Sequence, residues 1–269
     1  MKIPLWLISA SVVCLAALSA AAPAPSWDEV RRLNSEGLPD PQSGRLVYMV
    51  DSKEYGSTNT RQGALAHSKL ELVTQTFDDG ADTAREDFSK ITAGTPAKPY
   101  KTELRKNRQV TRLDTDPNQL QKYTATGADR FSRDHNWLES GLVPFSKDVT
   151  GQYLRTENFR GSQALVYEVR PAKGTGVRGL VWLAPAFGYQ MTHVELWGQT
   201  KLHREQTNSG FRSVNGVMIP HTIESTEYAP GKTALPFLKS ETVTLREATL
   251  NRPLPSDAFA LVLPSDTIR

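Results

Sequence analysis

Apolar and polar residues alternate along most of the chain beyond residue 44 with a period of two, the spacing of a β-strand. β-Branched and aromatic residues are frequent in these stretches, and turn residues separate them at hairpin spacing, which predicts about ten strands. The strand-like segments are RLVYMVD, KLELVTQTF, KTELRK, RQVTRLD, ALVYEV, GLVWLA, THVELW, KLHREQ, VMIPHTIE and ETVTLRE. The chain is therefore expected to be mainly β, with one large antiparallel sheet.

Two stretches have helical spacing instead. The first begins at Ser26, where a serine followed three residues later by Glu29 forms a capping box, and it is expected to end between Asn34 and Glu36. The second is Ser132–Phe145, whose apolar residues recur at the spacing of one helix face. A few helices should therefore accompany the sheet.

One hairpin can be predicted in detail. Asn215 and Gly216 both tolerate the positive φ of a type I′ turn, so Phe211–Val214 and Val217–Ile223 should pair. Pro220 lies inside the second strand and has no N–H to donate, so this strand must lie at an opening in the sheet or at a bulge.

Residues 1–21 carry one positive charge, an uncharged apolar stretch and small residues at the end, which is typical of a secretory signal peptide. The expected mature protein is a single domain, residues 22–269. An uncleaved anchor is the alternative, because the apolar stretch is nearly as long as a spanning helix. Lipidation at Cys14 is not expected, since Val13 stands where lipoprotein signals carry a small residue.

Cys14 is the one cysteine of the chain, so the mature protein must be stabilised without disulfides. For an exported protein this fits the bacterial envelope, with a periplasmic or secreted location. The formal net charge is only +3. The densest basic run, Thr102–Asp114, is flanked by acids and lacks interleaved aromatics, which favours a solvated strand pair over a nucleic-acid surface.

The C-terminal third, residues 177 to 263, contains a recognisable order of turns and strands. In sequence these are the Trp-x-x-Pro end of a strand at Trp182–Pro185, a turn at Gly188, the strand pair Thr192–Trp197 and Lys201–Gln206, the Val-Asn-Gly-Val hairpin, and an Asn-x-Pro-Leu-Pro ending at Asn251–Phe259. This order is similar to that of bacterial proteins of the outer-membrane lipoprotein-sorting (LolA/LolB-like) family. Ala184 departs from the acidic residue usual in that family before the proline of the first motif, and residues 26 to 176 show no motif of the family.

The resemblance implies a strongly curved, incomplete antiparallel barrel with helices over its open side, around an apolar cavity for acyl chains. It implies no catalytic motif and no cofactor. Alternation suggests which side chains would line the concave side of such a sheet, although the same residues would form an ordinary core if the domain were filled. The candidate lining residues are Trp182, Val194, Leu196, Val217, Ile219, Ile223, Phe237, Val243 and Leu245.

Catalytic and metal-binding motifs are absent from the sequence: there is no G-x-S-x-G, no phosphate-binding glycine loop and no H-E-x-x-H. The histidines nearest to a metal pattern are His193 and His203, each with a glutamate two residues on, and His221. However, the simplest hairpin pairs Leu196 with His203, which would put His193 and His203 on opposite faces. His135 beside Asp134 and His67 beside Ser68 are adjacent in sequence and so are not ready dyads.

The sequence therefore predicts an exported binding protein that holds a lipid, a lipoprotein acyl chain or another apolar ligand. The alternative is an envelope sensor that uses the same fold to bind a protein partner. A hydrolase or a metalloprotein is a third possibility with little in the sequence to favour it.

Overall fold

The structure is a computed structural model that describes residues 23–37, 41–58, 61–92, 95–96, 98–107, 109–115, 118–124, 149–172, 177–198, 200–228 and 237–261. The elements in chain order are α1 (Trp27–Gly37), β1 (Ser43–Thr58), β2 (Arg61–Asp78), β3 (Thr83–Thr92), β4 (Thr95–Pro96), β5 (Lys101–Lys106), β6 (Gln109–Thr115), β7 (Asn118–Thr124), β8 (Val149–Phe159), β9 (Ser162–Pro171), β10 (Arg178–Ala184), the 3₁₀ turn η2 (Pro185–Phe187), β11 (Gln190–Trp197), β12 (Leu202–Ser209), β13 (Arg212–Val214), β14 (Val217–Ile219), β15 (Thr222–Tyr228) and β16 (Phe237–Leu250).

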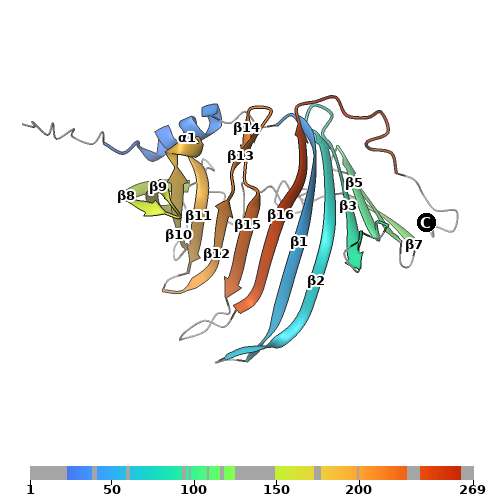
Figure 1. The fold of residues 1–269 in the computed structure, drawn as a ribbon, viewed down its shortest axis with the longest axis horizontal. Helices are drawn as coiled ribbons and strands as arrows, with labels where there is room; N and C mark the ends of the chain where they lie inside the picture. The colour runs from blue at the N-terminus through green and yellow to red at the C-terminus, as the bar shows by residue number, and fades with distance from the viewer. Residues whose placement is uncertain are drawn as a thin grey trace, which may run out of the picture.

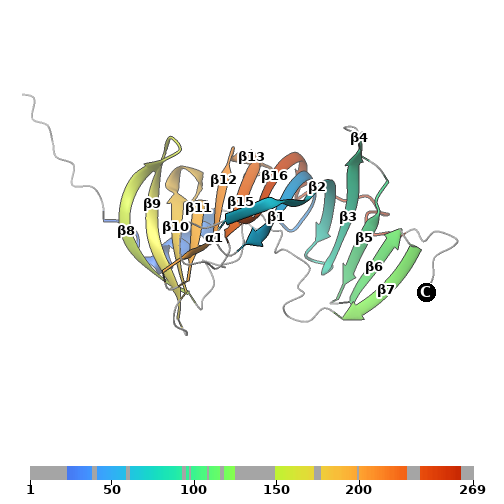
Figure 2. The ribbon, with the colours of Figure 1, turned by 90° about the horizontal axis from the view of Figure 1, so that it is seen from below.

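A single antiparallel sheet of 14 strands dominates the described residues, and it is strongly curved (Figures 1 and 2). Its order is β7-β6-β5-β3-β2-β1-β16-β15-β12-β11-β10-β9-β8, with β4 paired to β3 alone. The predicted fold class, a mainly β chain with an open, curved antiparallel sheet, is confirmed. One helix, rather than several, accompanies the sheet in the part of the chain that the structure describes.

The sheet has a topological reason to stay open. Every neighbour along its path is antiparallel, and the path without β4 has an odd number of strands, so the edge strands β7 and β8 run in the same direction. Direct pairing of the two edges would therefore have to be parallel. The edges are well separated in Figure 2.

The predicted first helix is confirmed as α1. The Glu29 amide donates to Ser26 Oγ at 3.2 Å, which is the expected cap. The helix is tied to the sheet by the Tyr167 hydroxyl, which donates to the Pro25 carbonyl at 2.7 Å, and by the Asn34 side chain, which donates to the Tyr189 carbonyl at 3.1 Å. The face of the sheet against which α1 packs is called the inner face below, and the opposite face the outer face.

The predicted turn is also confirmed, because Asn215 and Gly216 have φ of 49° and 83° and Val214 pairs with Val217. The expectation of one strand from Val217 to Ile223 is wrong. Pro220 and His221 separate β14 from β15, and β13 and β14 form a two-stranded sheet of their own. The physical reason is that Pro220 offers no N–H to a neighbouring strand.

Several expectations were incomplete. The pattern did not reveal β3, β7 or β8, and the helix expected at Ser132–Phe145 lies outside the described residues. Residues 92–99, which have no strand pattern, contain the last residue of β3 and the two-residue β4 in their described part.

Candidate functional site

Residues that are paired from strand to strand show that the inner face extends without interruption from β11 to β1. Directly paired residues point to the same face, and pairing joins Val194 to Gln206, then to Ser225, Glu241 and Ser52. Buried apolar side chains gather on this face in two groups, one that includes Val194 at the end of this row of paired residues and one beside the polar members of the row on β15, β16 and β1. We call them the helix cluster and the hairpin cluster.

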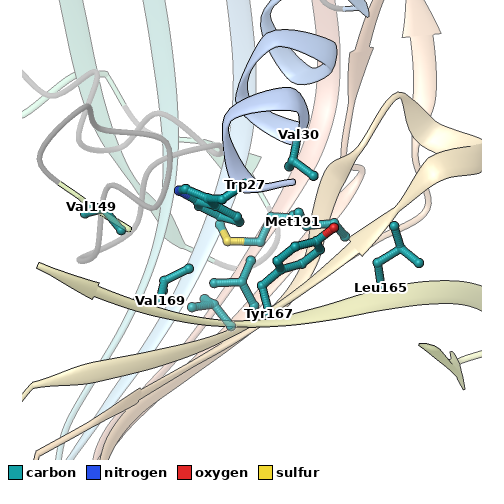
Figure 3. Close-up of a cluster of buried hydrophobic side chains, with 10 residues drawn as sticks. Trp27, Val30, Val149, Leu165, Tyr167, Val169 and Met191 are labelled. Carbon is teal, nitrogen blue, oxygen red and sulfur yellow. The ribbon is translucent and has the colours of Figure 1, made fainter. Parts of the chain in front are cut away.

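The helix cluster lies under α1 and is built on β8 to β11 (Figure 3). Trp27 packs on Tyr167 with ring centroids 5.3 Å apart. A Cβ added to Gly151 would meet the Trp27 ring at 2.3 Å, so the indole lies directly on the β8 backbone. The members of the cluster are Trp27, Val30, Val149, Leu165, Tyr167, Val169, Val181, Leu183, Met191 and Val194.

The hairpin cluster lies under β13 and β14 and is built on β1, β2, β3, β15 and β16. Apart from side-chain packing, the hairpin is held by the Asn215 amide, which donates to the Leu250 carbonyl at 2.6 Å. At its base, the His221 amide donates to the Ser209 carbonyl at 2.9 Å. The members of the cluster are Leu46, Tyr48, Val73, Phe88, Val217, Ile219, Ile223, Leu245 and Leu250, with Val50, Phe77, Tyr100, Val214, Val243 and Ala248 packed against them.

Most of the predicted lining residues lie on the inner side of the sheet, but they are divided. Val217, Ile219, Ile223, Val243 and Leu245 come together in or against the hairpin cluster, with Val217 and Ile219 on the covering hairpin rather than on the sheet wall.

The other predicted lining residues are scattered. Val194 belongs to the helix cluster, and Leu196, half-buried on the same face, belongs to neither cluster. Phe237 opens β16, but its side chain lies outside the described residues.

Trp182 does not lie with the others. It packs with Ala164 and Val166 on the outer face, whereas Val181 beside it belongs to the helix cluster. The assignment of Trp182 to the same lining as Val194 is therefore corrected, because neighbouring residues of a strand point to opposite faces.

The outer face around Trp182 holds a network of aromatic and acidic side chains. The His193 ring lies against Trp182 and Phe159, with centroids at 4.8 and 5.0 Å, and its Nδ1 is 2.9 Å from Thr207 Oγ1. A hydrogen bond from His193 holds the pKa of Glu195 below its usual range. His193 is buried and its two ring nitrogens have protein partners, so this histidine is a satisfied structural residue.

The three candidate metal-binding histidines do not gather. The pairing is Leu196 with Arg204 rather than with His203, because a bulge shifts the register next to Trp197. The His203 ring lies over Gly198 at the end of the strand pair, and His221 Nδ1 is 3.2 Å from the Thr222 hydroxyl. Within the described ranges, no group of three histidine, cysteine or acidic residues is placed to hold a metal ion.

The inner face of β2, β3, β5 and β6 carries a row of polar side chains that the sequence pattern did not reveal. Pairing aligns Gln75, Glu86, Glu103 and Arg112 across four strands. Glu86 is buried, and it accepts a hydrogen bond from Gln75 Nε2 at 3.1 Å. Burial, together with the charge of Glu103, raises the pKa of Glu86 to about 8, so Glu86 is mainly neutral at pH 7.

Three lysines lie beside this row, at the border of the hairpin cluster. Lys69 and Lys90 place their Nζ atoms 5.7 and 5.2 Å from the ring centroid of Tyr100, and Lys101 Nζ lies 3.6 Å from that of Phe88. The signal that could have found them is the alternation itself, because Ala84, Glu86, Phe88 and Lys90 share one face of β3. The pattern was not recognised because both faces of β3 carry charged residues.

A shallow depression of about 550 Å³ lies elsewhere, between the ends of β1 and β2 and the C-terminal segment. Its lining mixes polar residues, such as Asp78 and Arg252, with apolar ones, such as Leu254 and Phe259, and it is open to solvent, so it is not an enclosed acyl-chain cavity.

No helix in the described part of the chain has the length and apolar character needed to cross a membrane.

The fold is similar to that of solved structures of the LolA superfamily and of an outer-membrane lipoprotein-sorting domain. A domain from Vibrio parahaemolyticus named as an outer-membrane lipoprotein-sorting protein superposes with a TM-score of 0.57 at 13% identity, covering 87% of this chain and 96% of that one. The LolA superfamily protein NE2245 from Nitrosomonas europaea gives 0.51 at 13% identity, covering 88% and 99%. A DUF1329 family protein from Desulfovibrio piger gives 0.56 at 10% identity, covering 88% and 98%.

The likeness of fold thus extends over most of the chain, beyond the C-terminal third where sequence motifs were recognised. No protein-family model and no curated protein matches the sequence. At these identities the comparisons define the fold alone.

Proposed function

We propose that the protein is an exported envelope protein that holds an acyl chain or another apolar ligand against the inner face of its sheet. The fold shared with lipoprotein-sorting proteins supports a binding role. The leader-like residues 1–21 support export, and the cysteine-free sequence after them fits the periplasm. A free lipid or the acyl chains of a lipoprotein are the ligands that fit.

One observation carries the proposal. The apolar inner side chains of the hairpin cluster are covered by β13 and β14, which pair only with each other among the described strands. The hairpin can therefore move off the sheet without breaking the strand pairing of the 14-stranded sheet. An acyl chain then takes the place of Val217 and Ile219 over Leu245 and Tyr48.

The apolar area that β13 and β14 bury on the hairpin cluster sets how long an acyl chain must be to displace them. Val214, Val217 and Ile219 face the cluster from the hairpin, and burying three such side chains contributes roughly 5 to 9 kcal/mol. Each methylene of a ligand contributes about 0.8 kcal/mol when it is buried. A chain of roughly ten methylene groups therefore offsets the free energy lost when the hairpin side chains are displaced. Long acyl chains should therefore bind and short ones should not.

The test is uptake of a fluorescent apolar probe by the purified protein, combined with native mass spectrometry for lipid that co-purifies. The informative variant is Asn215→Asp, which keeps a residue that tolerates positive φ but loses the amide that donates to Leu250. Losing about 0.5 to 1.4 kcal/mol of hairpin attachment should raise the affinity for the probe about two- to tenfold.

Asn251→Asp is the matched control. Asn251 also has positive φ, at 53°, but it uses its carbonyl oxygen to accept from the Gln42 amide, and an aspartate keeps that acceptor. Its affinity for the probe should match that of the unmodified protein. If the unmodified protein takes up no apolar probe and carries no lipid, the carrier proposal is to be abandoned in favour of a role in binding an envelope protein.

A further inference from the structure

We propose that the inner face also carries a site for an anionic head group, a carboxylate or a phosphate, formed by Lys69, Lys90 and Lys101 beside the hairpin cluster. This inference rests on the proposed function, because it names the class of ligand: an amphiphile with a negatively charged head. The apolar tail lies on the hairpin cluster, and the head meets the three ammonium groups.

Strand pairing places the three lysines on neighbouring strands of the inner face. Lys69, Lys90 and Lys101 lie on β2, β3 and β5, which are consecutive in the sheet. Lys69 and Lys90 approach the ring of Tyr100, and Lys101 lies over the ring of Phe88. Phe88 belongs to the hairpin cluster and Tyr100 packs against it, so charged and apolar surfaces share these two rings. An amphiphile needs this kind of boundary.

Lys69 and Lys90 are exposed to solvent, whereas Lys101 and its partner Glu103 are similarly shielded, at 20% and 17% exposed. Lys69 forms an ion pair with Glu71 at 2.6 Å, but its side chain is 42% exposed while that of Glu71 is 6% exposed. Lys90 is exposed, and no carboxylate of the described residues forms an ion pair with it. A molecule arriving from solvent therefore meets ammonium groups first.

The net charge of the patch points the same way. Lys69 and Lys101 are offset by Glu71 and Glu103, which lie 2.6 and 3.3 Å away. Lys90 is left as an excess positive charge. Two further acids lie nearby. Glu86 is buried and mainly uncharged at pH 7, and Asp114, paired with Lys101 across β5 and β6, is offset by Arg112 at 2.9 Å, so neither cancels that excess. An anionic head group near Lys90 would complete the charge balance.

The experiment compares cis-parinaric acid with its methyl ester, two fluorescent probes that have the same tail and differ in head-group charge. The purified protein should bind the acid about tenfold more tightly than the ester, which corresponds to one favourable charge contact. Lys90→Gln should remove most of this preference and leave the affinity for the ester unchanged. Raising the salt concentration should also reduce the preference.

Lys106→Gln is the matched control, because Lys106 is an exposed lysine at the end of β5 on the opposite face from Lys101. It should leave both affinities unchanged. Competition by dodecanoate and by dodecyl phosphate against bound cis-parinaric acid then distinguishes a carboxylate from a phosphate head.

The outcomes separate the two proposals. Equal affinity for the acid and the ester would overturn the head-group site and leave the apolar site standing. A Lys90→Gln protein that loses affinity for both probes equally would also overturn it, since Lys90 would then support the fold and not the head group. Failure of the unmodified protein to bind either probe would overturn the proposed function and the head-group site together.

Discussion

Under α1, the inner face of the sheet carries apolar side chains on three neighbouring strands, such as Tyr167, Val181 and Val194. On β2, β3 and β5 a row of the same length reads Gln75, Glu86 and Glu103. The two regions belong to one sheet and have the same strand geometry. Their difference lies in what covers them, because a helix can exclude water from an apolar row, whereas polar side chains must find partners in each other or in solvent.

The inner face therefore changes from apolar to charged along the strand order of the sheet. An apolar region covered by α1 lies at one side, the hairpin cluster lies in the middle, and charged side chains lie beyond it. An amphiphile placed over the hairpin cluster would therefore have one preferred orientation, with its head toward β2, β3 and β5.

The largest expected effect comes from removing the cover of the apolar region. Trp27→Ala should lower the free energy of unfolding by about 3 to 5 kcal/mol, because the indole is 5% exposed and fills the space between α1 and the β8 backbone. Urea unfolding followed by circular dichroism measures it. Leu154→Ala, at a side chain 42% exposed on β8, should stay within about 0.5 kcal/mol. Similar losses in the two variants would mean that α1 does not stabilise the sheet.

A smaller effect distinguishes the hairpin cluster from the open part of the inner face. Ile219→Phe should cost about 1 to 3 kcal/mol, because the side chain is 7% exposed in a filled cluster. Leu196→Phe should cost less than about 0.5 kcal/mol, because Leu196 is half-buried and outside both clusters. Thermal and urea unfolding of both variants test this, and equal costs would contradict the division of the inner face.

The last effect concerns the charged region and is a dependence of stability on pH, not a fixed loss. Because the pKa of Glu86 is raised to about 8 in the folded protein from 4.5, folding takes up a proton between these values, and stability should fall as the pH rises through this window. The contribution of Glu86 is at most about 1.4 kcal/mol per pH unit. Glu86→Gln keeps a neutral side chain and should lose this slope.

Urea unfolding of both proteins at pH 5, 6, 7 and 8 measures the difference in slope. Glu247→Gln, at a side chain 68% exposed on β16, is the control and should follow the unmodified protein. Parallel curves for the unmodified protein and Glu86→Gln would show that Glu86 is charged in the folded state.

Local signals in the sequence predicted local structure well. The serine cap at Ser26 and the turn at Asn215 and Gly216 each depend on a few neighbouring residues, and both were found as expected. The face of Trp182 could not be read, because β10 is apolar on both sides and alternation then carries no direction.

Features that depend on strand order and register could not be predicted from the sequence. The row that joins Gln75, Glu86 and Glu103 depends on which strands are neighbours and on their register, and both are set by tertiary packing. The bulge beside Trp197 moved the expected pairing of Leu196 by one residue. The hairpin cluster was foreseen only in its C-terminal members, because Leu46, Tyr48, Val73 and Phe88 come from the half of the chain that showed no family motif.

The pairing of β1 with β16 constrains the order in which the chain can fold. Ser43 Oγ donates to the Arg252 carbonyl across 209 positions of sequence, and this seam lies in the middle of the sheet. Strands β1 to β7 and β8 to β16 can each form from neighbours in sequence, but closing the seam must wait until almost the whole chain is present. Until then β1 and β16 are exposed edges, open to pairing with other chains. A chain with this topology therefore benefits from staying unfolded until its C-terminal strand is available to pair with β1.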